Sequence, residues 1–166
     1  MKKRDFDIAF RGLALGQHEF QYDLNDTFFT LFEYSEYRGL RGTTELKMLK
    51  SETVLDLELH FAGSIEAPCD ITNEMYTQEL KNSFVMQIKF GDEYNDENEE
   101  LLILPHGNYQ FNAAQMIYEL VVLSIPSKLL GPNAGNGLED FIEEEEDEKE
   151  EKTDPRWDQL KNLLNK

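Results

Sequence analysis

Apolar and polar residues alternate along much of the chain, which is the pattern of half-buried β-strands. Between residues 6 and 10, phenylalanine and isoleucine side chains fall on one face. Aromatic residues and leucine repeat this period between residues 20 and 24. Because a glycine-containing stretch separates the two segments, we expect them to pair as a hairpin.

Two longer strands are expected at residues 41–50 and 52–62. In the second, leucines at every other position face one way and acidic residues face the other, which is typical of an antiparallel strand with one wet face. Gly63 then interrupts the pattern. Further along, the sequence predicts a strand at 84–90, a polar loop at 92–100 and a strand at 101–104.

Helical spacing replaces the period of two in the second half of the chain. Asn112 is a suitable N-cap for a helix that runs to Ser124, and Pro126 closes the element. Near the N-terminus, Asp26 can cap a short helix, although the apolar run 28–32 that follows it also fits a strand.

The C-terminal region differs in composition from the rest of the chain. Residues 139–153 are strongly acidic and bury too little apolar surface to fold, so we expect a disordered linker there. Asp154 followed by Pro155 predicts the start of a short amphipathic helix over 154–166. Residues 1–138 are left as one domain with a hydrophobic core.

These elements together predict an α+β fold. We expect a mainly antiparallel sheet or open barrel of about six strands, with one or two helices packed on it and a disordered acidic C-terminal tail.

The terminal helix is too short to be stable alone, so another surface must bury its apolar face. We expect this face to bind a partner together with the acidic run, and docking on the chain's own domain is the alternative. The expected partner-binding residues are Trp157, Leu160, Leu164, Glu143, Glu144, Glu145 and Glu146.

The formal net charge is −18, and the acidic run does not account for all of it. Residues 1–138 alone carry 22 acidic and 11 basic residues. Nucleic-acid binders usually display a basic footprint, so we expect weak binding to bare RNA and a basic protein as the partner. The first 50 residues contain eight of the basic residues and are the one region where RNA contact is expected: Lys2, Lys3, Arg4, Arg11, Arg38, Arg41, Lys47 and Lys50.

Candidate chemistry is sparse. Cys69 is the single cysteine, so one chain forms neither an internal disulfide nor a multi-thiolate zinc site, and we expect no cofactor. We interpret Cys69 as a small buried side chain at a strand end, because acids flank it and no base is near in the sequence. The three histidines are isolated from one another, and the acidic loop 92–100 lacks the register of a calcium loop. The chain is therefore predicted to be a non-enzyme.

No segment approaches the ~20 apolar residues of a membrane span, and no apolar run follows the basic N-terminus. We therefore expect a cytoplasmic protein.

Three passages resemble the Bacteroidetes branch of the YceD family, which is linked to accumulation of large-subunit ribosomal RNA. They are Phe6 to Phe20, the central Gly63 to Asp70 with Phe90 to Tyr94, and Ile117 to Pro126 followed by an acidic stretch and Asp154 to Trp157. Members of the family typically have Cys-Asp-Arg-Cys at the central site, and many have further cysteines after the helix. Here the site is Cys69-Asp70-Ile71-Thr72, so the metal site plausible for some relatives lacks its ligands.

The resemblance implies an accessory role in synthesis, processing or stability of large-subunit rRNA, and it implies no catalysis. Combined with the acidic charge, it predicts binding to a basic ribosomal protein or a large-subunit precursor. The alternative is a generic acidic interaction adaptor unrelated to ribosomes.

Overall fold

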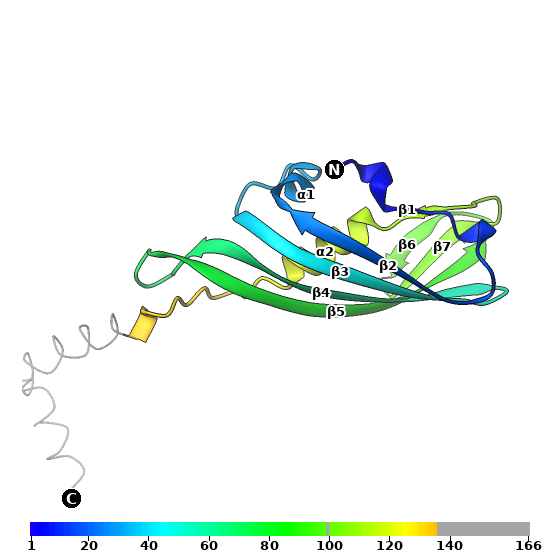
Figure 1. The fold of residues 1–166 in the computed structure, drawn as a ribbon. Coiled ribbons are helices and arrows are strands. Elements are labelled where there is room, and N and C mark those ends of the chain that lie inside the picture. The colour runs from blue at the N-terminus through cyan, green and yellow to red at the C-terminus, as the bar shows by residue number, and fades with distance from the viewer. Residues whose placement is uncertain (99, 136–166) are drawn as a thin grey trace, which may run out of the picture. The chain divides into compact units, whose positions relative to one another are not determined.

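A computed structural model describes residues 1–98 and 100–135 of the chain, and residues 1–131 form one compact unit. Within these described residues, six strands form one sheet in the order β2-β3-β4-β5-β7-β6. Their bounds are β2 Gly16–Asn25, β3 Arg38–Lys50, β4 Val54–Pro68, β5 Met75–Gly91, β6 Asn95–Asn98 and β7 Leu101–Pro105. Neighbouring strands in this part of the chain are antiparallel except β5 and β7, which are parallel. The predicted α+β fold with a mainly antiparallel sheet is confirmed (Figure 1).

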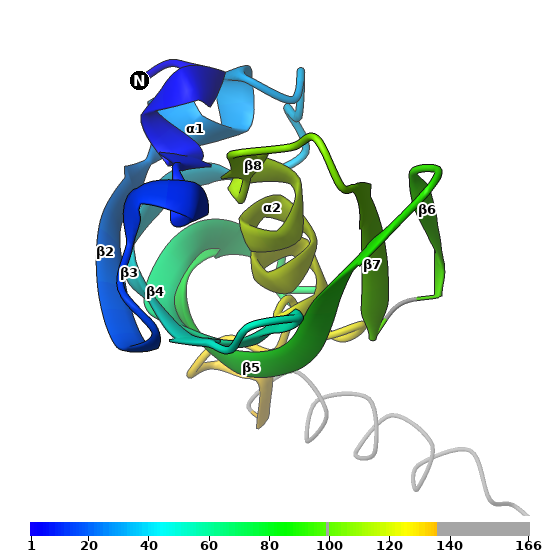
Figure 2. The ribbon, with the colours of Figure 1, turned by 90° about the vertical axis from the view of Figure 1, so that its right-hand side faces the viewer.

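The sheet curls around helix α2 (Ala114–Leu123), and this arrangement forms the core (Figure 2). Ile117 and Leu120 of the helix are buried, as are the inward leucines of β4. The N-cap is Ala113, one residue after the predicted Asn112, but the Asn112 side-chain oxygen still accepts a hydrogen bond from the Ala114 N–H at 3.0 Å, the first N–H of the helix. Leu123, the last residue of the helix, is 77% exposed.

The predicted N-terminal hairpin is wrong. The segment before β2 forms two 3₁₀ turns, η1 (Lys3–Phe6) and η2 (Phe10–Gly12), around the two-residue strand β1 (Asp7–Ile8). Strand β1 pairs with β8 (Phe111–Asn112), whereas all ten residues of β2 pair with β3. The thirteen-residue β3 offers β2 a full-length partner, which the two extended residues of β1 do not.

Aromatic packing explains why residues 6–10 nevertheless have the pattern of a strand. Phe6, Ile8 and Phe10 are all buried. The Phe6 ring lies 5.0 Å from that of Tyr22, and the Phe10 ring lies 5.3 Å from that of Phe90. The alternation therefore arises because the 3₁₀ turns and β1 together bury every second side chain, and it does not indicate a long strand.

The short helix α1 (Asp26–Thr30) resolves the ambiguity over residues 28–32 in favour of a helix. Its N-cap is Asn25, one residue before the predicted cap, and the Asn25 side chain accepts from the Thr27 N–H at 2.9 Å. Asp26 instead accepts a hydrogen bond from the Leu40 N–H and so ties the helix to β3.

The polar loop expected at 92–100 contains a strand. Residues Asn95–Asn98 form β6, which pairs with β7 although all four side chains are exposed. Backbone pairing at a sheet edge needs no apolar side chain, so the hydrophobic pattern could not reveal it.

Two paired glycines, one in β3 and one in β4, allow the sheet to curl at this point. Gly42 pairs directly with Gly63, and β4 continues through Gly63, where the sequence predicted a break. A Cβ on Gly63 would lie 2.6 Å from the Arg41 carbonyl oxygen and 2.8 Å from the Gly42 Cα. The backbones thus approach more closely than any side chain permits.

We expect Gly63→Ala to lower the free energy of unfolding by about 1–3 kcal/mol, because the new methyl group meets backbone atoms that cannot move aside. Urea denaturation followed by circular dichroism measures this loss. Gly107→Ala is the matched control, since a Cβ at Gly107 meets nothing within 4 Å. Equal stabilities of the two variants would show that the close approach of β3 and β4 does not require glycine at position 63.

Candidate functional site

The tight turn between β4 and β5 carries the central motif, Cys69 and Asp70. The Cys69 N–H donates to the Glu74 carbonyl at 2.9 Å, and the Asn73 N–H donates to the Cys69 carbonyl at 2.9 Å. Asn73 adopts a left-handed backbone with φ of 56°, a conformation that asparagine tolerates better than most residues. The longest hairpin of the sheet therefore ends in a rigid, hydrogen-bonded turn.

Asp70 binds the turn to the segment that follows α2. Its N–H donates to the Leu129 carbonyl at 2.8 Å, and its carboxylate accepts from the Leu129 N–H at 2.7 Å. Leu129 itself is buried in the core. Two chain segments that lie far apart in the sequence are thereby joined by a reciprocal pair of hydrogen bonds, one of them to a charged acceptor.

The thiol of Cys69 is buried within this junction, with 2% of the residue exposed, which confirms the interpretation of a small buried side chain. The Thr72 side chain and the backbone N–H groups of Thr72, Gly131 and Ile71 lie around the sulfur as donors to its thiolate form. These donors favour the thiolate and lower the pKa of Cys69 to about 7, although burial acts in the opposite direction.

The residues around Cys69 do not fit a bound metal ion. Thr72, three residues after Cys69, offers the sulfur a hydroxyl donor and not a second soft metal ligand. Residues 1–98 and 100–135 contain no group of three or more histidine, cysteine or acidic side chains placed to hold a metal. The donors around the sulfur come from both sides of the junction: Ile71 and Thr72 belong to the turn between β4 and β5, and Gly131 belongs to the segment that follows α2.

The surroundings of the turn also do not support nucleophilic catalysis. His60 pairs with Glu58 at 2.9 Å and lies roughly 25 Å along β4 from the turn, at the ordinary rise per residue. The His106 N–H donates to the Gly91 carbonyl at the far end of β5. Burial raises the pKa of Tyr76, and the nearby Cys69 and Asp70 raise it further, so that phenol stays neutral at physiological pH.

The eight basic residues of the first 50 do not gather at one place. Arg41 and Lys47 lie roughly 20 Å apart along β3. The Lys50 ammonium donates to the Phe10 and Leu13 carbonyl oxygens at 2.9 and 2.6 Å, and Lys3 lies 4.9 Å from the centre of the Phe32 ring. These lysines have partners within the fold, which leaves fewer cations to contact RNA.

The expected partner-binding residues lie outside the described residues, together with the acidic linker 139–153 and the helix 154–166. They are Trp157, Leu160, Leu164, Glu143, Glu144, Glu145 and Glu146.

Sequence reasoning missed Thr72, Tyr76, Leu129 and Gly131 as members of the Cys69 junction. Thr72 could have been found from its place in the sequence, three residues after Cys69 in the same turn. Leu129 and Gly131 carry no local signal, because their role depends on where α2 delivers the chain.

We expect Thr72→Val to raise the pKa of Cys69 toward its ordinary value of about 8.5, because the substitution removes the strongest donor to the thiolate. The ultraviolet absorbance of the thiolate, followed as a function of pH and corrected with Cys69→Ser, measures the midpoint. Thr77→Val on β5 is the control and leaves the midpoint near 7. A wild-type midpoint at or above 8.5 would contradict the hydrogen-bonded thiolate.

The lowered pKa also sets a pH dependence of stability. Since the folded state favours the thiolate, Cys69 stabilises the fold fully above its ordinary pKa, and this contribution is lost as the pH falls through about 7. We therefore expect the stability difference between the wild type and Cys69→Ser to shrink over that interval. Urea denaturation at several pH values measures it, and a difference that stays constant would be the contrary result.

Comparisons with known proteins were made with the whole chain. Residues 57–164 match the family model described as large ribosomal RNA subunit accumulation protein YceD. No curated protein and no solved structure matches the chain. In the part of the chain that the structure describes, no helix has both the length and the apolar character needed to span a membrane.

The match begins in β4 and takes in the Cys69 turn, β5 and α2. The family description names accumulation of a ribosomal RNA and no catalytic activity. Since the matched residues make up more than half of the sequence, the chain belongs to the YceD family of large ribosomal RNA subunit accumulation proteins.

Proposed function

We propose that this protein is a cytoplasmic, non-enzymatic accessory factor that supports synthesis, processing or stability of large-subunit rRNA by binding a basic ribosomal protein or a large-subunit precursor particle. The observation that carries the proposal is the family match over residues 57–164. That span includes the Cys69 turn and the acidic C-terminal residues.

Charge supports a protein partner over bare RNA. Residues 1–138 hold twice as many acidic as basic residues, 22 against 11, and the acidic linker adds further negative charge. Phosphate contacts supply most of the affinity in RNA binding, and a field of this sign repels phosphates. The same field attracts a lysine- and arginine-rich protein and accelerates its association.

The C-terminal region supplies two kinds of contact in this proposal. The run Glu143 to Glu146 provides negative charge for a basic surface, and Trp157, Leu160 and Leu164 provide an apolar face. Tryptophan is among the residues that contribute most to binding energy at interfaces, and the leucines extend its apolar face. A solubilising tail would need the charge but not the apolar face.

Affinity purification of the tagged chain from lysate of its native host tests the proposal. We expect a basic ribosomal protein or large-subunit precursor RNA to be enriched, and the ribosomal protein to remain bound after ribonuclease treatment. Enrichment of acidic or unrelated proteins alone would favour a generic adaptor and overturn the ribosomal role.

Replacing Trp157, Leu160 and Leu164 by alanine should weaken binding to the purified partner roughly tenfold or more and leave the melting temperature unchanged. Calorimetry measures both quantities. Alanine at Gln159, Asn162 and Asn165 is the control, because it changes the polar positions of the same segment. If the apolar variant melts several degrees lower, the segment docks on its own domain and the proposed partner contact is wrong.

We expect the full chain to bind bare large-subunit rRNA more weakly than about 1 µM at physiological salt, because its net charge opposes phosphate contact. Filter binding over a series of salt concentrations measures this affinity. Submicromolar binding that falls steeply with added salt would instead indicate a direct RNA-binding surface.

A further inference from the structure

Strand β2 forms a free edge of the sheet. All ten of its residues pair with β3 in unbroken register, and among the described residues no strand pairs with its other side. Natural edge strands usually carry charged residues, above all lysine, or proline or a bulge that discourages a further strand. β2 contains no proline, lysine or arginine, its charged residues are the acidic Glu19 and Asp23, and its pairing has no register shift. The edge is therefore open to backbone pairing with a segment that is not itself acidic.

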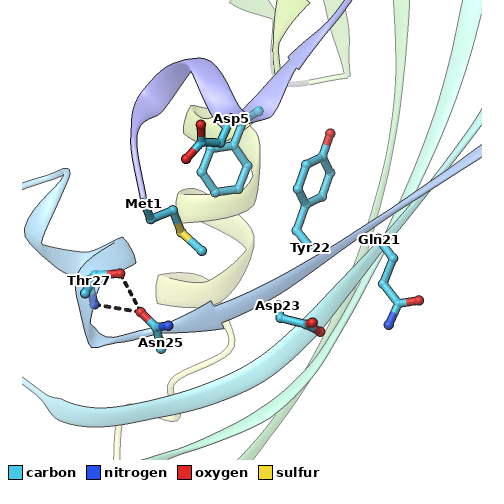
Figure 3. A pocket seen from close by; sticks show the side chains of 8 residues that line it. Met1, Asp5, Gln21, Tyr22, Asp23, Asn25 and Thr27 are labelled. Carbon is cyan, nitrogen blue, oxygen red and sulfur yellow. Dashed lines mark hydrogen bonds between the residues drawn. The ribbon is translucent and has the colours of Figure 1, made fainter.

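A pocket of about 310 Å³ lies along this edge. Gln21, Tyr22 and Asp23, which are consecutive residues of β2, all line it. Figure 3 shows Tyr22 on the side of the strand that faces η1, with Gln21 and Asp23 on the opposite side. A pocket lined by both faces of one strand opens at the edge of that strand, where an added strand would place its side chains.

The lining of the pocket suits a long cationic side chain. Asp5 and Asp23 contribute carboxylates, and the Tyr22 and Phe6 rings, 5.0 Å apart, contribute an aromatic wall. No lysine or arginine is among the residues that line the pocket. A guanidinium pairs with carboxylates and stacks on aromatic rings, so this combination favours arginine.

The existing partners of the two carboxylates leave acceptor capacity free. Asp23 accepts from the Thr43 hydroxyl at 3.2 Å through Oδ1, and Asp5 accepts from the Lys2 N–H at 2.7 Å through Oδ2. A carboxylate has about four acceptor sites, and each of these hydrogen bonds occupies one. Both groups can therefore take a charged donor without losing these bonds.

We propose that an extended, arginine-bearing segment of a basic protein adds to the free edge of β2 as a further strand and inserts one arginine side chain into the pocket between Asp5, Asp23 and Tyr22. Backbone hydrogen bonds to β2 supply affinity, and the pocket selects the cationic side chain, as in other cases of strand addition. The inference rests on the proposed function, because the occupant of this site is the basic partner proposed there.

Charge distinguishes this occupant from a second copy of the chain. Two β2 edges that paired with each other would bring Glu19 and Asp23 of both copies together with no basic residue in either strand. The net negative charge of the rest of residues 1–138 adds to that repulsion. A basic segment meets attraction at the same positions.

The test uses the full chain and a peptide of alternating arginine and threonine, about as long as β2. Only every second N–H of an added strand faces its neighbour. We therefore prepare two peptides, one N-methylated at the arginines and one at the threonines. One methylated peptide should bind like the parent and the other should fail, whereas equal binding by both would show that no strand is added.

Two variants with the same change of charge locate the site. Asp23→Lys fills the pocket and should weaken peptide binding roughly tenfold or more, whereas Glu79→Lys, on the exposed face of β5 away from this edge, should change it little. Hydrogen exchange should show new protection of β2 amides in the complex. Equal losses from both variants, or protection elsewhere only, would overturn the proposed site. A dimer of the free chain that Asp23→Lys dissociates would assign the edge to self-association instead.

The outcomes separate this inference from the proposed function. If the purified ribosomal partner binds Asp23→Lys as tightly as the wild type, the edge is not the site, although the function stands. If affinity purification yields no ribosomal component while the peptide still pairs with β2, the site stands and the ribosomal role fails.

Discussion

The close approach of β3 and β4 at Gly42 and Gly63 is the constraint on which the fold depends. A long antiparallel hairpin can curl around one helix only if its backbone bends at a defined place, and a paired glycine provides that place. The Phe61 ring packs over this glycine pair, because a Cβ on either Gly42 or Gly63 would meet it. The hollow that results accepts α2 and its buried face of Ile117, Leu120 and Val121.

The position of α2 decides what lies beside the Cys69 turn. The chain leaves the helix at Ser124 and reaches the turn at Leu129, where the main chain and carboxylate of Asp70 bind it. A cluster of donors around a single sulfur then closes the junction. Thr72 and backbone N–H groups surround the sulfur from both segments, so the junction is held by donors to one side chain.

The acidic surface and the open edge of β2 have a common consequence. The open edge offers backbone pairing to any extended segment, and the negative charge around it repels a second copy or a nucleic acid and favours a basic protein segment. Residues 1–138 carry 22 acidic and 11 basic residues, and this charge suits the basic partner that we propose. The family match by itself indicates a role in the accumulation of large-subunit ribosomal RNA.

The sequence by itself determined the elements whose signal is local. The alternation around Leu55 and Leu57 specified a strand and its buried face, and the Asn112 cap with the apolar stripe after it specified a helix. The motif at Cys69 and the order of the flanking passages indicated the family. These conclusions need only neighbouring residues, because side-chain period and capping act within a few positions.

Only the tertiary structure decided which elements meet. Residues 6–10 have the period of a strand, yet their burial comes from turns packed on Tyr22 and Phe90, and their backbone partner is Phe111. Strand β6 has no apolar pattern and forms because β7 offers it a backbone. Leu129, Gly131 and the β2 edge acquire their roles from the path of the chain around α2. Contacts between distant residues depend on how the sheet curls, and no local pattern encodes that geometry.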